Sequence, residues 1–204
     1  MKSKPLLFFA CAALAVIGLT FYSIISITPK ELVFSSTDIL AFRKAKDQLL
    51  RSQVNAPFYL DKNFDSLRYF PPNPSVVFTS EFFKTTDGQT LDLMPDRTGY
   101  PSHIVKGFVL LEKDTWRDTL YILKDLEEQS DTLYFVPFSD ETNGKETYGG
   151  GRYLDVVIKP AKPVRIDFNY AYSPYCAYNA AYVCPKNPAL NRLSKRLEAG
   201  EKTY

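Results

Sequence analysis

The hydrophobic and polar positions of this chain divide it into three stretches. An apolar run without charge extends from Pro5 to Pro29, a stretch with a helical period follows, and a period of two dominates the rest. About 20 apolar residues are enough for a helix to cross the roughly 30 Å hydrocarbon layer of a bilayer. We therefore expect a transmembrane anchor over residues 1–30, an amphipathic helix and linker over 31–55, and a β-rich exported domain over 56–204.

The charges around the apolar run predict its orientation. Lys2 and Lys4 precede the run, whereas Glu31 offsets Lys30 on its other side. The side with the excess of lysine and arginine generally stays in the cytoplasm. We therefore expect a single-pass protein of the bacterial inner membrane, with a cytoplasmic amino terminus and a periplasmic globular domain.

Two other interpretations of this segment stay open. The residues Ala13, Leu14 and Ala15 have the small-large-small pattern of a site where a secretory signal peptide is cleaved. Cys11 ends a sequence that loosely resembles a lipobox, which predicts a lipoprotein instead. We favour the anchor because more apolar helix, and not a polar tether, follows Cys11.

A helical period occupies residues 38–53. The N-cap candidates are Ser35, Ser36 and Thr37. Apolar residues recur at spacings of three and four, at Ile39, Phe42, Ala45 and Leu49. Charged residues are expected on the outer face, at Arg43, Lys44, Lys46 and Asp47. We expect this helix to pack on the following domain, and the alternative is a helix that lies on the membrane surface or on a partner.

A period of two, typical of half-buried strands, occupies most of the remaining chain. The segments that show it are 75–83, 90–94, 102–113, 118–126, 131–139, 151–159 and 164–169. Asp87 and Gly88 form a dipeptide typical of tight hairpins, so we expect a hairpin there. Short turns join neighbouring strands in antiparallel pairs, which predicts a mainly β fold, an antiparallel meander that closes into a small barrel or folds as a sandwich.

A C-terminal helix is predicted after Pro188. Leu190, Leu193 and Leu197 share one helical face, and Gly200 is a plausible stop. We expect this helix to dock on the barrel.

Composition supports a β fold and argues against nucleic acid as a partner. The 14 Tyr and 15 Phe favour strands, where large flat side chains pack against cross-strand neighbours. The 25 Lys and Arg nearly balance the 23 Asp and Glu, and no long basic run occurs. The chain therefore lacks the field that recruits nucleic acid.

Candidate chemistry is sparse. His103 is the single histidine, which excludes sites that need two imidazoles, and we expect it to be structural. The glycines at 149–151 lack the lysine of a phosphate-binding loop and the spacing of a dinucleotide fingerprint. We therefore predict no cofactor, no metal site and no catalytic residue.

Cys176 and Cys184 lie eight positions apart, which matches no structural zinc motif. In an exported domain two such cysteines most simply form a disulfide, because that compartment is oxidising. A reactive thiol and metal ligation are the alternatives.

Polar residues near the carboxy terminus form a tentative ligand-binding set. Asp167 and Asn169 share one face of a strand, and their favoured role is to hold a turn. The full set is Tyr148, Arg152, Asp167, Asn169, Tyr172 and Cys176.

Two blocks of residues carry a resemblance to a known family. The first block is Phe138, Asp140, Thr142, Gly144, Thr147, Tyr148, Gly151, Arg152 and Leu154. The second is Asp167, Phe168, Asn169, Ala171, Tyr172, Pro174, Cys176, Ala177, Tyr178, Cys184, Pro185, Asn191, Arg192, Leu193, Ala199, Gly200 and Glu201. On these residues the chain resembles the bacterial and archaeal family called domain of unknown function 1684. The resemblance implies a shared fold and no established reaction, substrate or cofactor.

One departure from the family pattern bears on function. That pattern has two prolines and an acidic residue shortly before the Asn-Arg-Leu tripeptide, whereas this chain has Asn187, Pro188, Ala189 and Leu190 there. The missing acid weakens an enzyme interpretation.

We expect a membrane-anchored, periplasm-facing accessory or interaction subunit with a protein partner in a larger envelope complex. The grounds are the anchor, the single domain and the lack of a complete catalytic set in the sequence. The alternative is a small-molecule-binding or hydrolytic barrel whose pocket is built from the tentative ligand-binding set.

Overall fold

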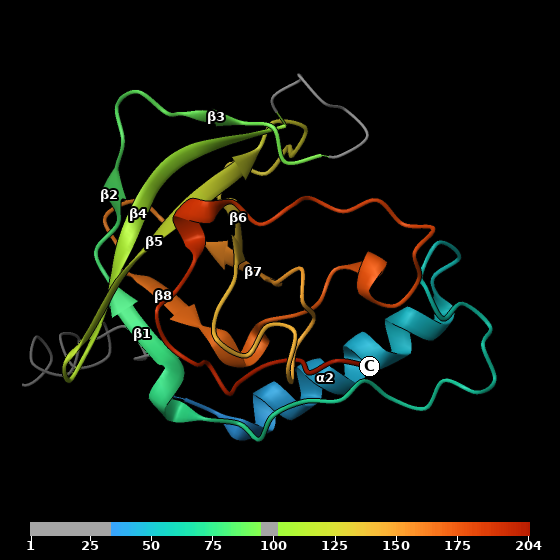
Figure 1. Ribbon diagram of the computed structural model, residues 1–204. Coiled ribbons are helices and arrows are strands. Elements are labelled where there is room, and N and C mark those ends of the chain that lie inside the picture. The colour runs from blue at the N-terminus through green and yellow to red at the C-terminus, as the bar shows by residue number, and fades with distance from the viewer. Residues whose placement is uncertain (1–33, 95–101) are drawn as a thin grey trace, which may run out of the picture. The chain divides into compact units, whose positions relative to one another are not determined.

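The computed structural model describes residues 34–94 and 102–204. The predicted anchor over residues 1–30, with its alternatives, lies outside the described residues. Within them, no helix has both the length and the apolar composition to cross a bilayer. The elements are α2 (Ser36–Ser52), β1 (Val77–Ser80), β2 (Phe83–Lys84), β3 (Thr90–Leu91), β4 (His103–Lys113), β5 (Trp116–Asp125), β6 (Leu133–Phe138), β7 (Arg152–Val157) and β8 (Val164–Asp167) (Figure 1). Short 3-10 turns lie at Pro74–Val76, Phe168–Tyr170, Tyr175–Ala177 and Ala189–Asn191.

Strands β4 to β7 form the predicted antiparallel meander (Figure 1). The pairing of Lys113 with Trp116 leaves a two-residue turn between β4 and β5, in which Asp114 has a φ of 54°. Positive φ in such a turn matches the right-handed twist of the flanking strands. The mainly β, antiparallel class is confirmed.

The prediction of a closed barrel is wrong. In the described part of the chain, β1 and β8 pair with each other in a two-stranded sheet, and the larger sheet follows the order β2-β4-β5-β6-β7 with β3 also on β4. The connection from β7 to β8 contains Pro160 and Pro163, which have no N–H to extend a ladder. The larger sheet therefore ends at β7 and does not close onto β8.

The two sheets share one hydrophobic core. Alternation along each strand points every second side chain inward, as the period of two predicts. The inward residues are Phe78 of β1, Val109 and Leu111 of β4, Leu120 and Ile122 of β5, Val136 and Phe138 of β6, Leu154 and Val156 of β7, and Val164 and Ile166 of β8.

The predicted hairpin at Asp87 and Gly88 is also wrong. Strands β2 and β3 both pair with β4 and not with each other. A Cβ atom at Gly88 would lie 2.6 Å from the carbonyl oxygen of Val105, so only glycine allows this close approach to β4. Glycine is therefore required at position 88 by the close contact with β4, and not by a tight hairpin turn.

Helix α2 has the predicted N-terminus but a different buried face. The Ser35 side chain accepts a hydrogen bond from the Asp38 backbone N–H at 3.2 Å, which confirms this residue as the N-cap. Phe42 and Leu49, expected inside, are 39% and 47% exposed, whereas Arg43 is 6% exposed. Ile39 is buried as predicted, and the buried face of α2 continues through Arg43 to Leu50.

The guanidinium of the buried Arg43 has one hydrogen-bond acceptor and one aromatic neighbour. It donates to the carbonyl oxygen of Phe70 at 2.9 Å and lies 4.5 Å from the centre of the Tyr69 ring. A cation with such partners can be enclosed, which a simple apolar-inside rule does not anticipate.

The predicted C-terminal helix is absent: a 3-10 turn spans Ala189–Asn191, and the residues after it form no helix. Leu193 and Leu197 enter the main core, but Leu190 packs on a separate cluster formed around Leu93 and Leu123. The three leucines therefore serve two clusters and do not form one helical stripe, although their spacing fits a helix.

The C-terminal segment folds around a fully buried Arg152 from β7. One guanidinium nitrogen donates to Asp140 Oδ2 at 2.6 Å and to the Leu197 carbonyl oxygen at 3.0 Å. The other donates to the carbonyl oxygens of Ala199 and Glu201. The charge of Arg152 is thus neutralised by Asp140, and its donors hold the chain end in place.

Glu201 joins this chain end to α2. Its carboxylate is fully buried, forms an ion pair with Lys46 of α2 at 2.7 Å, and accepts a hydrogen bond from the Tyr178 hydroxyl. Two buried ion pairs therefore connect β7, the C-terminus and α2.

We predict that the Asp140→Asn variant loses about 3–5 kcal/mol of unfolding free energy, because it leaves Arg152 buried without a counter-charge. Urea unfolding followed by circular dichroism measures this loss. The matched control is Glu141→Gln, which removes the adjacent exposed carboxylate and should change stability by less than about 0.5 kcal/mol. Equal losses in the two variants would contradict the assigned role of Asp140.

Candidate functional site

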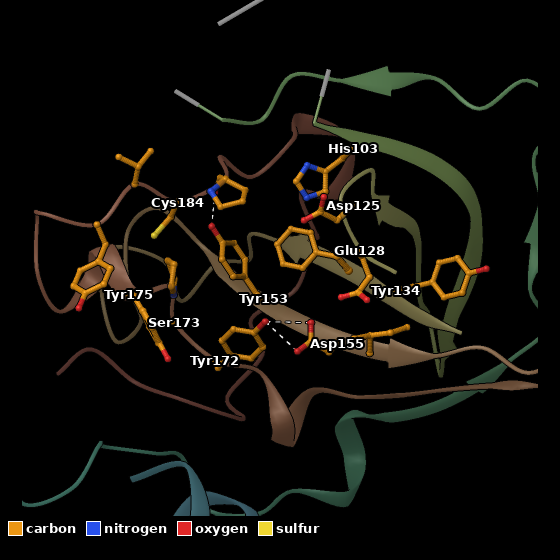
Figure 2. Close-up of a pocket in the computed structure, with 16 residues that line it drawn as sticks. His103, Asp125, Glu128, Tyr134, Tyr153, Asp155, Tyr172, Ser173, Tyr175 and Cys184 are labelled. Atoms are coloured by element: carbon orange, nitrogen blue, oxygen red, sulfur yellow. Dashed lines mark hydrogen bonds between the residues drawn. The ribbon is translucent and has the colours of Figure 1, made fainter. Parts of the chain in front are cut away.

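A pocket of about 360 Å³ lies on the face of β7 that points away from the core (Figure 2). Alternation along β7 directs Leu154 and Val156 into the core and Tyr153 and Asp155 to the opposite face. The loop that follows Tyr172 forms the facing wall of the pocket. We call this hollow the β7 pocket.

Aromatic rings form a continuous wall of the β7 pocket. The Phe135 and Tyr153 rings meet edge to face at 4.8 Å between centroids, and the Tyr153 and Tyr172 rings do so at 5.8 Å. His103 lies 5.2 Å from Phe135 at the other end. Edge-to-face contacts hold each ring in a defined orientation, so the wall is formed before any ligand enters.

Acidic side chains add polarity to the aromatic wall. Asp125, Glu128 and Asp155 all line the β7 pocket (Figure 2). The Tyr172 hydroxyl donates to the two carboxylate oxygens of Asp155 at 3.1 and 3.2 Å. The pocket therefore combines carboxylates with ring faces and edges.

The ionisation of Asp155 reflects this mixed environment. Water reaches its carboxylate through the pocket, yet the surrounding side chains remove part of its hydration, and this burial raises its pKa. The hydrogen bond from Tyr172 and the charge of Lys46 act in the opposite direction. Asp155 is therefore easier to protonate than an ordinary aspartate.

Tyr153 and Tyr172 act as neutral hydrogen-bond donors. Burial raises the pKa of both phenols, and the Asp155 carboxylate adds to this effect at Tyr172. Tyr153 donates its hydroxyl hydrogen to the carbonyl oxygen of Pro185. This bond fixes the loop that forms the outer wall of the β7 pocket.

His103 lines the same pocket but is largely enclosed, with 3% of its surface exposed. Its Nδ1 lies 2.8 Å from the Ser102 hydroxyl, and Asp125 is its cross-strand neighbour. Burial lowers the pKa of His103, and Asp125 partly offsets this. The imidazole is therefore neutral at neutral pH.

A second hollow of about 600 Å³ adjoins the β7 pocket. Its own lining includes Tyr148, Cys176 and Asn187. The two hollows share Tyr153, Pro174 and the loop residues Tyr182–Pro185. One loop therefore separates them, and the Tyr153 hydroxyl holds that loop at Pro185.

The two cysteines meet at this second hollow as free thiols, so the predicted disulfide is not formed in the structure. The Cys176 backbone N–H donates to Cys184 Sγ at 3.1 Å, which places the residues side by side. Burial, with the neighbouring Cys176 thiol, raises the pKa of Cys184 to about 12. The Cys184 thiol is therefore protonated and weakly nucleophilic at neutral pH.

The structure separates the members of the tentative ligand-binding set. Tyr172 lines the β7 pocket, whereas Tyr148 and Cys176 line the second hollow. Arg152, Asp167 and Asn169 line neither. The six side chains therefore do not meet in one concavity.

Asp167 and Asn169 hold a turn, which was their favoured role. Asp167 accepts from the Asn169 backbone N–H at 3.0 Å and forms an ion pair with Arg165 at 2.9 Å. The Asn169 side chain accepts from the Asn73 N–H at 2.7 Å and donates to the Asn73 carbonyl oxygen at 2.8 Å. This pair ties the end of β8 to the loop before β1.

The sequence did not indicate the residues that give the β7 pocket its wall and charge, among them Asp125, Phe135, Tyr153 and Asp155. The alternation of β7 could have indicated part of this wall. Leu154 and Val156 point to the core, so Tyr153 and Asp155 must share the opposite face of the strand, which pairs with β6. Their convergence with Tyr172 depends on a long-range bridge between Tyr153 and Tyr172, which no local pattern predicts.

The donor set of the described residues does not suggest a metal centre. No group of three or more histidine, cysteine, aspartate or glutamate side chains in that part of the chain is arranged to hold an ion. The carboxylates of the β7 pocket are interleaved with rings, an arrangement suited to organic ligands.

We predict slow alkylation of Cys184 by iodoacetamide in the reduced, folded protein at neutral pH. A pKa raised to about 12 leaves almost no thiolate, so the rate should be at least about tenfold lower than for the same cysteine in the urea-unfolded chain. Mass spectrometry of tryptic peptides measures both rates. Comparable rates in the folded and unfolded chains would contradict the buried, protonated thiol.

Comparisons with known proteins agree with this architecture. The chain is similar to an uncharacterised protein of Haloarcula marismortui whose solution structure was determined by NMR, with 28% sequence identity and a TM-score of 0.62. The match covers 82% of this chain and 93% of that chain. No curated protein matches the chain. Residues 62–202 match the model of the family described as "Protein of unknown function (DUF1684)", and the chain therefore belongs to this family.

Proposed function

We propose that this domain binds a small molecule in the β7 pocket. The observation that carries the proposal is a hollow of about 360 Å³ whose wall joins aromatic rings to the Asp155 carboxylate. Small-molecule sites are typically concavities of about 300–1,000 Å³, mostly apolar, with a few polar groups that orient the ligand. The β7 pocket has both properties.

The side chains of this wall are not needed for the core. Val136 and Leu154 fill the inner face of β6 and β7, whereas Phe135 and Tyr153 meet edge to face on the outer face. Neighbouring side chains already cover most of Tyr153, which is 6% exposed, and Phe135 is half-buried. The parts of these rings that stay uncovered line the β7 pocket, where a ligand would cover them.

We assign no reaction to the pocket. Ser102 lies next to His103, but its hydroxyl is not part of the pocket wall and also accepts a hydrogen bond from the Leu93 N–H at 3.2 Å. Cys184 is a protonated thiol and therefore a weak nucleophile. Binding without chemistry is the function that these residues support.

The role of an accessory subunit in an envelope complex stays a prediction. It depends on residues 1–30, which the structure does not describe, and on a partner. A ligand-binding domain held at a membrane would be compatible with it.

We predict that a bulky side chain at position 183 closes the β7 pocket. Val183 lies in the wall that this pocket shares with the second hollow and is 51% exposed, so Val183→Trp adds a ring at that wall without disturbing the core. The amide signals of Asp155 and Tyr172, which line only the β7 pocket, tell the two hollows apart. We expect small polar and aromatic compounds to shift the amide signals of Tyr153, Asp155 and Tyr172 in ¹H–¹⁵N NMR spectra. In Val183→Trp the affinity of those compounds should fall at least about tenfold, the equivalent of losing roughly 1.4 kcal/mol of contact.

The matched control for this variant is Val54→Trp, which adds the same ring at a position with 69% exposure that does not line the pocket. Its affinities should equal those of the unmodified protein. Compounds that bind elsewhere, or affinities that Val183→Trp leaves unchanged, would overturn the proposed site.

A further inference from the structure

We propose that the ligand of the β7 pocket is an organic cation whose ammonium group lies beside the Asp155 carboxylate, against the rings of Tyr153 and Phe135. This inference rests on the proposed function and adds the charge class of the ligand. It follows from the charges of the pocket, from its rings and from one hydroxyl that lacks a partner.

The charges that line the pocket are negative. Asp125, Glu128 and Asp155 contribute carboxylates, and no lysine or arginine is among the described residues of the lining. His103 adds no positive charge at neutral pH, because its burial lowers its pKa. Low-dielectric walls concentrate such a field inside a concavity, so a cation is attracted and an anion is repelled.

Lys124 and Lys46 both lie near the pocket. The Lys124 ammonium lies 5.7 Å from the centre of the Tyr134 ring and donates to the carbonyl oxygens of Ser130 and Leu133, so its donors are directed at the backbone. The charge of Lys46 is already balanced. Its ammonium lies 4.7 Å from the centre of the Tyr172 ring but forms an ion pair with the buried Glu201 at 2.7 Å. Both oxygens of Asp155 accept from the Tyr172 hydroxyl, at 3.1 and 3.2 Å, and each keeps a second lone pair for a ligand. The recorded partners of Asp125 and Glu128 are backbone N–H groups at 2.9 and 2.7 Å, which neutralise no charge.

The ring wall is suited to an ammonium group. Ring faces carry negative potential, so a cation within about 6 Å of a ring centre is attracted, more strongly when both are shielded from water. Phe135 and Tyr153 meet edge to face, and because a ring edge carries positive potential, the ammonium would lie over an exposed ring face and not at an edge. The ammonium of Lys46 has this geometry on the neighbouring Tyr172 ring, at 4.7 Å from its centre.

Ser173 supplies an independent indication of a ligand. Its residue is 2% exposed and lines the pocket, and its hydroxyl has no hydrogen-bond partner among the described residues. A buried hydroxyl without a partner loses its hydrogen bonds to water and gains none in return, which destabilises the empty pocket. A ligand that carries a hydroxyl or an N–H group would remove this cost.

The affinity should also depend on pH through Asp155. Burial raises the pKa of this carboxylate, while the Tyr172 hydroxyl and Lys46 lower it and Glu128 raises it. The group binds a cation only when ionised, above its pKa. Affinity should therefore be full at neutral pH and should fall as the pH drops through that raised pKa, before an ordinary aspartate would be protonated.

The test compares choline with 3,3-dimethyl-1-butanol, its uncharged isostere, in ¹H–¹⁵N NMR titrations of the domain. We expect choline to shift the amide signals of β7 and to bind at least about tenfold more tightly than the isostere. Asp155→Asn should weaken choline binding by about tenfold and leave the isostere unchanged. Glu128 is exposed, so Glu128→Gln should leave the domain folded, and it should weaken choline binding by about threefold.

Glu141→Gln is the matched control, since it removes an exposed carboxylate that does not line the pocket, and it should leave choline binding unchanged. Equal binding of choline and its isostere, or of choline to Asp155→Asn and the unmodified domain, would overturn the charge class while leaving small-molecule binding intact. A second outcome separates the two proposals. If choline, benzyltrimethylammonium and spermidine do not bind, but a neutral compound binds and Val183→Trp weakens its affinity, only the cation proposal is wrong. If no compound of either kind binds at the pocket, both proposals are wrong.

Discussion

The buried guanidinium of Arg152 is the constraint on which the rest of this structure depends. A charge without access to water must be neutralised, and Asp140 does this at 2.6 Å. The remaining donors reach backbone carbonyl oxygens of Leu197, Ala199 and Glu201, so the chain end has to return to β7. Because Glu201 then forms an ion pair with Lys46, the same constraint also positions α2. Burial of one side chain thereby organises three distant segments.

The two faces of strand β7 have different roles: one packs in the core, and the other lines the β7 pocket. Arg152, Leu154 and Val156 point inward, where they anchor the chain end and fill the core. Tyr153 and Asp155 point outward, where they form the wall of the β7 pocket. A pocket wall on so well anchored a strand is rigid, which lowers the ordering cost of binding.

The residues that carry the family resemblance serve mainly the interior. They include the buried polar side chains of Asp140, Thr142, Thr147, Arg152, Asp167, Asn169, Asn191 and Glu201. Buried polar groups need defined partners, so such residues specify a fold more than a ligand. Of the residues that line the β7 pocket, Tyr172, Pro174, Cys184 and Pro185 belong to the matching blocks, whereas Asp125, Phe135, Tyr153 and Asp155 do not. Membership of the family therefore indicates the architecture of this chain and part of the pocket wall, but not the pocket carboxylates.

The sequence by itself determined the strands of the meander, the region where α2 begins and the family. These features follow from alternation and turn chemistry over a few neighbouring residues. Only the tertiary structure decided which charges are buried, where the leucines of the C-terminus pack and which side chains line the β7 pocket. The physical reason is distance along the chain, since Lys46 meets Glu201 across 155 positions and Arg152 meets Ala199 across 47. A local pattern contains no information about such partners, and a buried ion pair depends on them entirely.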